Sequence, residues 1–191
     1  MQVRMRMGVQ LVSLVVAAMF AGQGLAQGAH VHGQADLRLV KEGSALLLEF
    51  ESPLDSLAGF EHAPATDAQR EALIQAGRLL HDAASLFVLP EAAGCVLQEV
   101  QMEMPYSEQL ADHDHDHDHD HDHGHGDGHG DGHRDVYAVY QFECATAAAA
   151  TELRVGLFDA FSRIERIRVQ TVSETGQGAV ELNRDHAHIS F

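Results

Sequence analysis

The stretch Val136-Tyr137-Ala138-Val139-Tyr140-Gln141-Phe142-Glu143-Cys144 decides the fold, because its apolar side chains recur at every second position. This is the period of a strand that buries one face and exposes the other. The predicted buried face carries Val136, Ala138, Tyr140 and Phe142. The stretch 95–104 alternates in the same way, and we expect one face to carry Val96, Val100, Met102 and Met104. Two such strands predict an antiparallel hairpin.

The loop of this hairpin, predicted to span residues 105–135, contains six Asp-His dipeptides in succession at 112–123, followed by a Gly/His/Asp tract. Its candidate metal ligands are His113, His115, His117, His119, His121, His123, His125, His129 and His133. Neutral imidazole is a common ligand of zinc and related metals, and the intervening aspartates attract cations. Such a composition cannot bury a core, so we expect disorder without metal. The alternative interpretation is an inert acidic spacer.

Residues 1–26 have the pattern of a secretory signal peptide. Arg4 and Arg6 form a positive segment, 11–20 is apolar, and Gly24-Leu25-Ala26 provides a small-x-small cleavage site. The apolar run is too short to span a bilayer as a stable helix. We therefore expect a periplasmic protein without membrane insertion, although a eukaryotic secretory route fits the same pattern. Residues 27–191 are predicted to form a single domain.

The net charge is −17, and loss of Arg4 and Arg6 with the signal peptide makes it −19. A charge of this sign argues against nucleic acid and anionic membranes as partners, and it suits a protein that binds cations.

The two cysteines are predicted to form a disulfide. Counting back equally along both strands from the loop sets Cys95 opposite Cys144, at a separation that a disulfide can span. Closing a loop of this length stabilises a fold by roughly 4 kcal/mol in the chain-entropy model. The alternative, thiolate ligation of a metal, requires reduced cysteines in an oxidising compartment.

The rest of the chain predicts an α+β fold: a mainly antiparallel sheet, one substantial helix, and the long disordered His/Asp-rich loop extruded from a hairpin. Residues 35–50 indicate another hairpin, and strands are expected at 86–89, 152–156 and 163–172, with a turn at 176–178. Thr66 and Gln69 have the form of a capping box, with Gln69 reaching back to the Thr66 backbone. The helix that follows should bury Leu73, Ala76, Leu80 and Ala84.

Five histidines outside the loop are candidate ligands of a fixed metal site: His30, His32, His62, His186 and His188. If the first and last strands are neighbours, the two His-x-His pairs bring four imidazoles together, the number that a tetrahedral zinc site takes. Exposed terminal histidines without a ligand are the alternative. His62 would complete such a site, with Glu61 as a further candidate, or would make only a structural hydrogen bond.

The chain resembles the ZrgA family across essentially its whole mature length. The resemblance rests on His30-x-His32-Gly33-x-Ala35-x-Leu37, on Gly59-Phe60-Glu61-His62-Ala63-Pro64, on Cys95, on the His/Asp tract and on Leu157-Phe158-Asp159-Ala160-Phe161 leading into 167–170. It implies a periplasmic zinc-binding protein associated with bacterial zinc uptake, acting beside a transporter. The ligand set of a fixed site is not carried over, so His186 and His188 are inferred from the residues alone.

Three functions compete. The first is zinc acquisition, in which the loop and a fixed domain site capture zinc for an inner-membrane zinc transporter complex. The second is a passive buffer for zinc, nickel or copper, which needs only the loop. The third is a zinc enzyme, which we do not expect, because the chain has neither His-Glu-x-x-His nor Gly-x-Ser-x-Gly.

Overall fold

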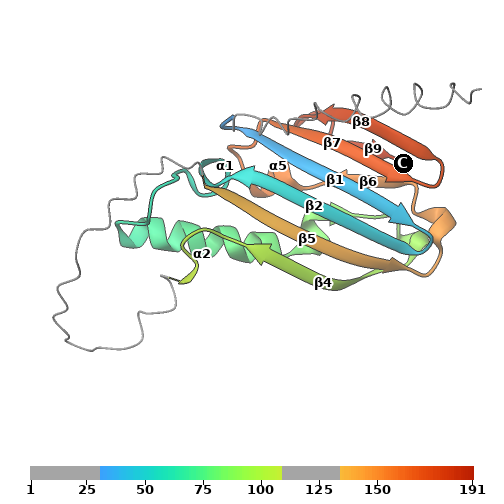
Figure 1. The fold of residues 1–191 in the computed structure, drawn as a ribbon, viewed down its shortest axis with the longest axis horizontal. Helices are drawn as coiled ribbons and strands as arrows, with labels where there is room; N and C mark the ends of the chain where they lie inside the picture. Colours follow the sequence, from blue (N-terminus) through green and yellow to red (C-terminus); the bar gives the residue numbers. More distant parts are fainter. Residues whose placement is uncertain (1–30, 109–133) are drawn as a thin grey trace, which may run out of the picture.

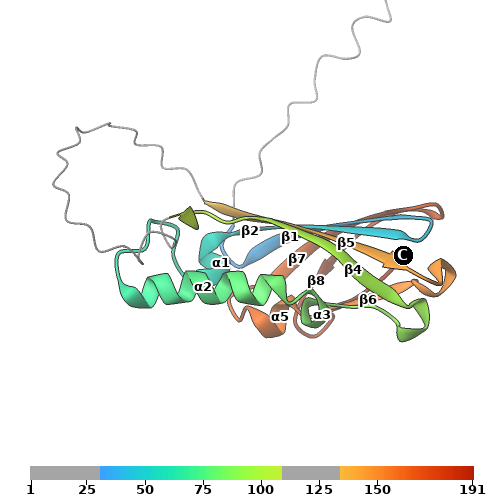
Figure 2. The same cartoon turned by 90° about the horizontal axis from the view of Figure 1, so that it is seen from below.

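The computed structural model describes residues 31–108 and 134–191, which fold into two layers. Figures 1 and 2 show a six-stranded sheet covered on one face by the longest helix, short helices and a small second sheet. The predicted signal peptide, 1–26, lies outside the described residues. Within the described ranges, no helix is both long enough and apolar enough to cross a membrane.

The large sheet has the order β4-β5-β2-β1-β7-β8. Its strands are β1 (Gln34–Glu42), β2 (Ala45–Pro53), β4 (Cys95–Glu103), β5 (Asp135–Cys144), β7 (Arg166–Ser173) and β8 (Gly176–Leu182). The small sheet, in the order β3-β6-β9, contains β3 (Phe87–Val88), β6 (Glu152–Val155) and β9 (His188–Ser190). The helices are α1 (Leu54–Ala58), α2 (Asp67–His81), α3 (Ala83–Leu86) and α5 (Leu157–Ala160), with single 3₁₀ turns at Glu91–Ala93 and Ala147–Ala149.

The predicted fold class is confirmed. All paired strands are antiparallel except β1 and β7, which are parallel, and α2 is the one substantial helix among the described residues. The turn after β7 lies at 174–175, two residues before the predicted position, because β8 already begins at Gly176.

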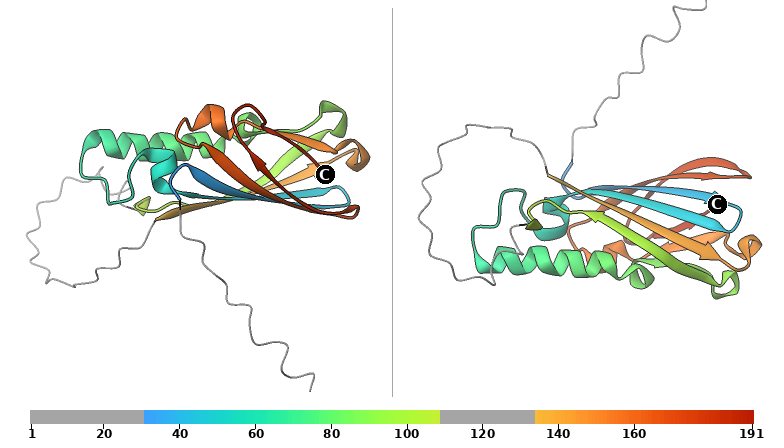
Figure 3. Two further views of the ribbon diagram at one scale, coloured as in Figure 1. Left: turned by 90° about the horizontal axis from the view of Figure 1, so that it is seen from above. Right: turned by 60° about the horizontal axis from the view of Figure 1, so that its bottom comes forward.

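One face of the large sheet forms the core with the second layer, as the two views of Figure 3 show. The predicted alternation is confirmed on β5, where Val136, Ala138, Tyr140 and Phe142 are all buried. The neighbouring strands β1 and β2 add Leu37, Leu39, Leu46, Leu48 and Phe50. Burying such side chains contributes about 1.5–3 kcal/mol each, so this face supplies the main driving force for folding.

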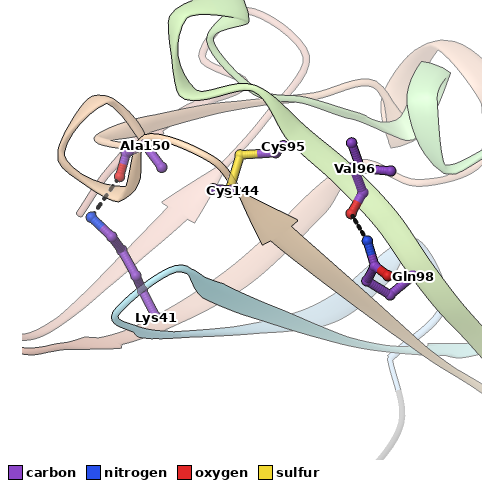
Figure 4. Close-up of a disulfide and its surroundings, with 6 residues drawn as sticks. All are labelled: Lys41, Cys95, Val96, Gln98, Cys144 and Ala150. Carbon is purple, nitrogen blue, oxygen red and sulfur yellow. Dashed lines mark hydrogen bonds between the residues drawn. A yellow bond between two sulfur atoms is a disulfide. The ribbon is translucent and has the colours of Figure 1, made fainter.

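The predicted hairpin of β4 and β5 is confirmed, with Cys95 directly opposite Cys144 and a disulfide of 2.04 Å between their sulfurs (Figure 4). Its register agrees with equal counting from Cys95 to Leu97 and differs by one residue from Glu99 to Glu103. Pairing passes from Leu97 to Glu99, so Gln98 is an extra residue, a β-bulge. The bulge brings Cys95 into register with Cys144.

The bulge also reverses the face of the residues before it, since side chains alternate along a strand. Val96 was expected to share a face with Val100 and Met102, and this is wrong: Val96 is 61% exposed, whereas the other two pack against the core. The Gln98 side chain turns back and donates its amide to the Val96 carbonyl at 3.3 Å (Figure 4).

The start of α2 follows its capping signal. The Thr66 hydroxyl accepts the Gln69 N–H at 3.2 Å, and the Gln69 side chain accepts the N–H of Ala65 at 2.8 Å, one residue before the predicted partner. Leu73, Ala76 and Leu80 are buried as predicted. Ala84 is exposed, contrary to the prediction, because α2 ends at His81 and Asp82 caps the separate helix α3.

Tyr140 joins the two layers. Its buried hydroxyl donates to the carbonyl of Leu80, near the end of α2, at 2.7 Å, and its ring meets Phe87 edge-on with 4.8 Å between centroids. Burial raises the pKa of Tyr140, because the phenolate would be poorly solvated there. The hydrogen bond from Tyr140 to Leu80 therefore fixes the position of α2 along the length of β5.

Replacing both cysteines by serine should lower the free energy of unfolding by roughly 4 kcal/mol, because the disulfide closes a long loop. Urea denaturation of the purified chain measures this loss. Treating the native protein with a reductant provides the matched control and should have the same effect. Free thiols in the exported protein, found by mass spectrometry, would contradict the structure.

Replacing Tyr140 by Phe should lower the free energy of unfolding at pH 7 by roughly 1–3 kcal/mol, since the Leu80 carbonyl loses its buried donor. Tyr137→Phe is the control at that pH, because Tyr137 is 43% exposed. A raised pKa in the folded state means that this contribution is complete below pH 10 and is lost as the pH rises further. The native protein should therefore lose more stability above pH 10 than Tyr140→Phe. Equal alkaline slopes would contradict the role given to Tyr140.

Candidate metal centre

Ten of the predicted ligands, the nine loop histidines and His30, lie outside the described residues. The structure does describe both ends of the loop. We call these ends, residues 104–108 and 134–135, the loop base. Figure 1 shows β5 beginning beside α1 at the left end of the sheet, where the base lies.

The loop base is attached to the segment 53–62, which runs from the end of β2 through α1. On one side of the loop, the Arg134 carbonyl accepts the N–H of Leu54 at 2.7 Å. On the other side, the Tyr106 hydroxyl donates to the Glu61 carbonyl at 2.9 Å. The Arg134 guanidinium lies 5.6 Å from the centre of the Tyr106 ring, within cation–π range, so the two sides also contact each other.

Tyr106 has a positive φ of 64°, a conformation that non-glycine residues rarely adopt. Such strain persists where surrounding contacts enforce it, and here the hydrogen bond to Glu61 and the Arg134 contact do so. The loop base is therefore held by specific contacts on both sides of the loop.

His32 faces two carboxylates of the same segment. Its Nε2 lies 3.0 Å from Oε1 of Glu61, and its Nδ1 lies 3.8 Å from Oδ2 of Asp55. The Asp55 and Glu61 side chains are only 20% and 23% exposed, whereas His32 is 58% exposed. Asp55 also pairs with Arg163 at 3.7 Å, which balances part of its charge.

The turn that carries His32 is fixed by backbone hydrogen bonds. The N–H of Gly33 donates to the buried hydroxyl of Ser56 at 2.9 Å, and the Gly33 carbonyl accepts the N–H groups of Glu165 and Arg166 at 2.8 and 3.0 Å. Gly33 has φ +79°, which glycine adopts without strain. His32 is thus held against α1 by residues on both sides of it in space.

The pair formed by His32 and Glu61 has the spacing of two metal ligands. Bonds of 2.0–2.1 Å at tetrahedral angles put two ligand atoms about 3.3 Å apart, close to the observed 3.0 Å. In the metal-free state a proton on Nε2 makes the contact a hydrogen bond. Asp55 lies on the side of the other ring nitrogen, where a carboxylate commonly orients a metal-binding histidine, but at 3.8 Å it makes no hydrogen bond to it here.

His62 follows Glu61 but points elsewhere. Its Nδ1 lies 2.8 Å from the Ala63 carbonyl, which only accepts, so Nδ1 carries the proton. The lone pair of Nε2 then accepts a hydrogen bond from the Gln69 side-chain amide at 3.4 Å, a partner that a metal ion would have to displace. A backbone carbonyl on Nδ1 is a common arrangement behind an Nε2 metal ligand, although here the same bond also serves the turn.

The expectation that the first and last strands are neighbours is wrong, because β1 belongs to the large sheet and β9 to the small one. Registers still place the turn 183–186 at the same end of the sheet as His32, since Ala35 lies beside Ile167 and Ile167 beside Leu182. His186 bonds to Asn183 through Nδ1 at 3.3 Å, and His188 pairs with Arg154 between β9 and β6. Both histidines are exposed.

Within residues 31–108 and 134–191, no three His, Cys, Asp or Glu side chains are grouped so that they could hold a metal. The described part of the chain offers the His32–Glu61 pair and, separately, His62. The local sequence pattern gave no sign of Asp55, which lies in a stretch without periodicity. It also gave no sign of Tyr106, whose role depends on folding of the distant segment 53–62.

The electrostatic surroundings of the loop base are acidic. An open pocket of about 550 Å³ between the two strand ends is lined by two carboxylates, Glu103 and Asp135, by Tyr137 and by one guanidinium, Arg134. The pKa of Tyr137 is raised to about 12, first by burial and then by the charges of Glu51, Asp135 and Glu103. A negative potential of this kind attracts cations to the place where the loop leaves the sheet.

Comparison with known proteins gives one family. The model described as ZrgA family zinc uptake protein matches residues 29–191, which include the whole described domain and the His/Asp tract. No curated protein matches the chain.

The tautomer of His62 can be tested directly. Two-bond ¹H–¹⁵N correlation spectra of the metal-free protein should show the proton on Nδ1, because the Ala63 carbonyl can only accept. Gln69→Ala is the control and should leave this tautomer unchanged. A proton on Nε2 would mean that His62 has no lone pair free to bind metal from that side.

Proposed function

The chain belongs to the ZrgA family of zinc uptake proteins, and on that basis we propose that it is a periplasmic protein that captures zinc. In this proposal the His/Asp-rich loop collects the ion and a fixed site on the domain holds it for an inner-membrane zinc transporter. Zinc is the cargo of the protein, and the proposal includes no catalytic step.

The observation that carries the proposal is the attachment of the loop base to the segment that bears Glu61. The Tyr106 hydroxyl bonds to the backbone of Glu61 itself, and the side chain of that residue faces His32 at 3.0 Å. An ion bound by the loop is therefore released next to a nitrogen and an oxygen ligand that are already paired. A tract attached to the domain at only one end would not confine the release of the ion to this place.

The loop is proposed to collect ions quickly and with little selectivity. Its nine imidazoles form many alternative ligand sets, so an ion moves from set to set without a conformational switch. Because both ends are tied to the domain, the effective concentration of loop-bound zinc at the base is high. The acidic pocket at the base adds attraction for cations.

The fixed site is proposed to use His32 and Glu61 as its first two ligands, with Asp55 orienting the His32 ring. Zinc usually takes four ligands. The remaining candidates for the domain site are His30, His62, His186 and His188. The fold supports His186 as a candidate, since the strand register puts its turn at the same end of the sheet as His32.

A passive buffer for zinc, nickel or copper is the second candidate function, and the density of imidazoles in the loop favours it. A buffer needs no ligand on the folded domain. The two functions therefore differ in what the domain binds when the loop histidines are absent.

Replacing the nine loop histidines by serine should remove most of the bound zinc while leaving the fold intact, since the core of the described residues is formed by other side chains. This variant keeps the length and the acidic charge of the loop. Isothermal titration with zinc should then give about one remaining equivalent. An unchanged stoichiometry would show that the loop is not the collector.

In that loop variant, His32→Ala should abolish the remaining zinc, and Glu61→Gln should weaken its binding, because the proposed first ligands are lost. Asp55→Asn should weaken it about 10–100-fold, the usual effect of a partner behind a ligand. His81→Ala is the matched control, since His81 is an exposed histidine at the end of α2. If the loop variant binds no zinc, the domain has no fixed site and the protein is a buffer.

A further inference from the structure

The strands at the edges of the described sheets differ in how they resist pairing with another chain. In the small sheet, β3 and β9 are only two and three residues long. In the large sheet, β4 is interrupted by the bulge at Gln98 and carries the exposed charges of Glu99 and Glu103. Short length, bulges and charged side chains are the usual protections of an edge strand.

The other edge strand, β8, has few of these protections. Its seven residues pair with β7 without a bulge, and all except Leu182 are exposed. It contains no Lys, Arg or Pro and a single charge, Glu181, while Val180 is 45% exposed. Figure 1 shows β8 as the rim of the large sheet, opposite β4.

The tight turn at 174–175 determines which backbone groups of β8 point away from β7. In a two-residue hairpin the flanking residues, Ser173 and Gly176, form a hydrogen-bonded pair. Hydrogen-bonded and non-bonded pairs alternate along an antiparallel ladder. The N–H and C=O groups of Gln177, Ala179 and Glu181 are therefore directed outward from the sheet.

We propose that β8 pairs antiparallel with β8 of a second copy of the chain, about a two-fold axis at Ala179. Ala179 then forms a hydrogen-bonded pair with the partner's Ala179, and Gln177 forms one with the partner's Glu181 at each end. The two large sheets become continuous.

The side chains of β8 complement one another in this arrangement. Gln177 lies opposite the partner's Glu181 at both ends of the interface, so an amide faces a carboxylate and no two like charges are opposed. On the inner face, Gly178 lies opposite the partner's Val180 and leaves space for that exposed side chain. The proposal is independent of zinc binding.

Analytical ultracentrifugation of the exported chain, with its loop intact and a chelator present, tests the proposal. The chelator prevents metal ions from bridging two loops. The native chain should show a monomer–dimer equilibrium. Gln177→Glu should weaken the dimer roughly fivefold by opposing two carboxylates, and Gln177→Lys should strengthen it roughly fivefold. Gln177 is exposed, so neither change disturbs the core.

Cysteine substitution tests the register of the pairing. Position 179 lies opposite its own counterpart, so Ala179→Cys should form a disulfide-linked dimer. Gln177→Cys is the matched control. It should form no disulfide-linked dimer, because position 177 of the second copy lies several residues away along the paired strand. A native chain that stays monomeric at millimolar concentration would overturn the proposal. So would a dimer whose stability changes in the same direction in both charged variants, or one that is cross-linked more readily through position 177.

Discussion

The pairing of β4 with β5 is the constraint on which the rest of the structure depends, because a long insertion separates two strands that must stay in register. Closing such a loop costs conformational entropy that rises slowly with loop length. At the far end of the hairpin the Cys95–Cys144 disulfide offsets this cost, and along β5 the buried side chains do the same. Tyr140 then transmits the position of β5 to α2 through the Leu80 carbonyl.

The same hairpin explains how an unusual composition is accommodated in an ordinary domain. In the sequence the His/Asp tract stands between the two strands, and the core of the described residues is formed without it. The loop base is fixed through Tyr106 and Arg134 to the segment 53–62, which also carries Asp55 and Glu61. Three segments that are far apart in the sequence therefore meet at one end of the sheet. They are His32, residues 55–61 and residues 104–108. In the proposed function this end is where cargo passes from loop to domain.

The sequence predicted those features that depend on local pattern. Period-two alternation located β1, β2 and β5, and the Thr66–Gln69 signal located the start of α2. The pairing of Cys95 with Cys144 was predicted, but the register between the bulge and the loop was off by one residue, since the bulge at Gln98 has no clear sequence signal. Long-range geometry was not predictable: the parallel pairing of β1 with β7 separates β1 from β9, and the expected meeting of the first and last strands fails. Asp55 and Tyr106 were missed for the same reason.

The two kinds of ligand at this end of the molecule suggest how selectivity would arise in the proposed function. A flexible loop rich in imidazoles follows the general order of affinities, in which copper binds more tightly than zinc. The His32–Glu61 pair mixes a nitrogen with a carboxylate oxygen, and its position is fixed by Gly33 and Ser56 on one side and by Asp55 on the other. A fixed geometry discriminates by coordination shape, which a flexible loop does not do. The loop would then provide the capacity to bind zinc, and the domain would provide the selectivity for zinc over other metals. For that role the fixed site needs only a few ligands, because the fold holds them in a rigid geometry.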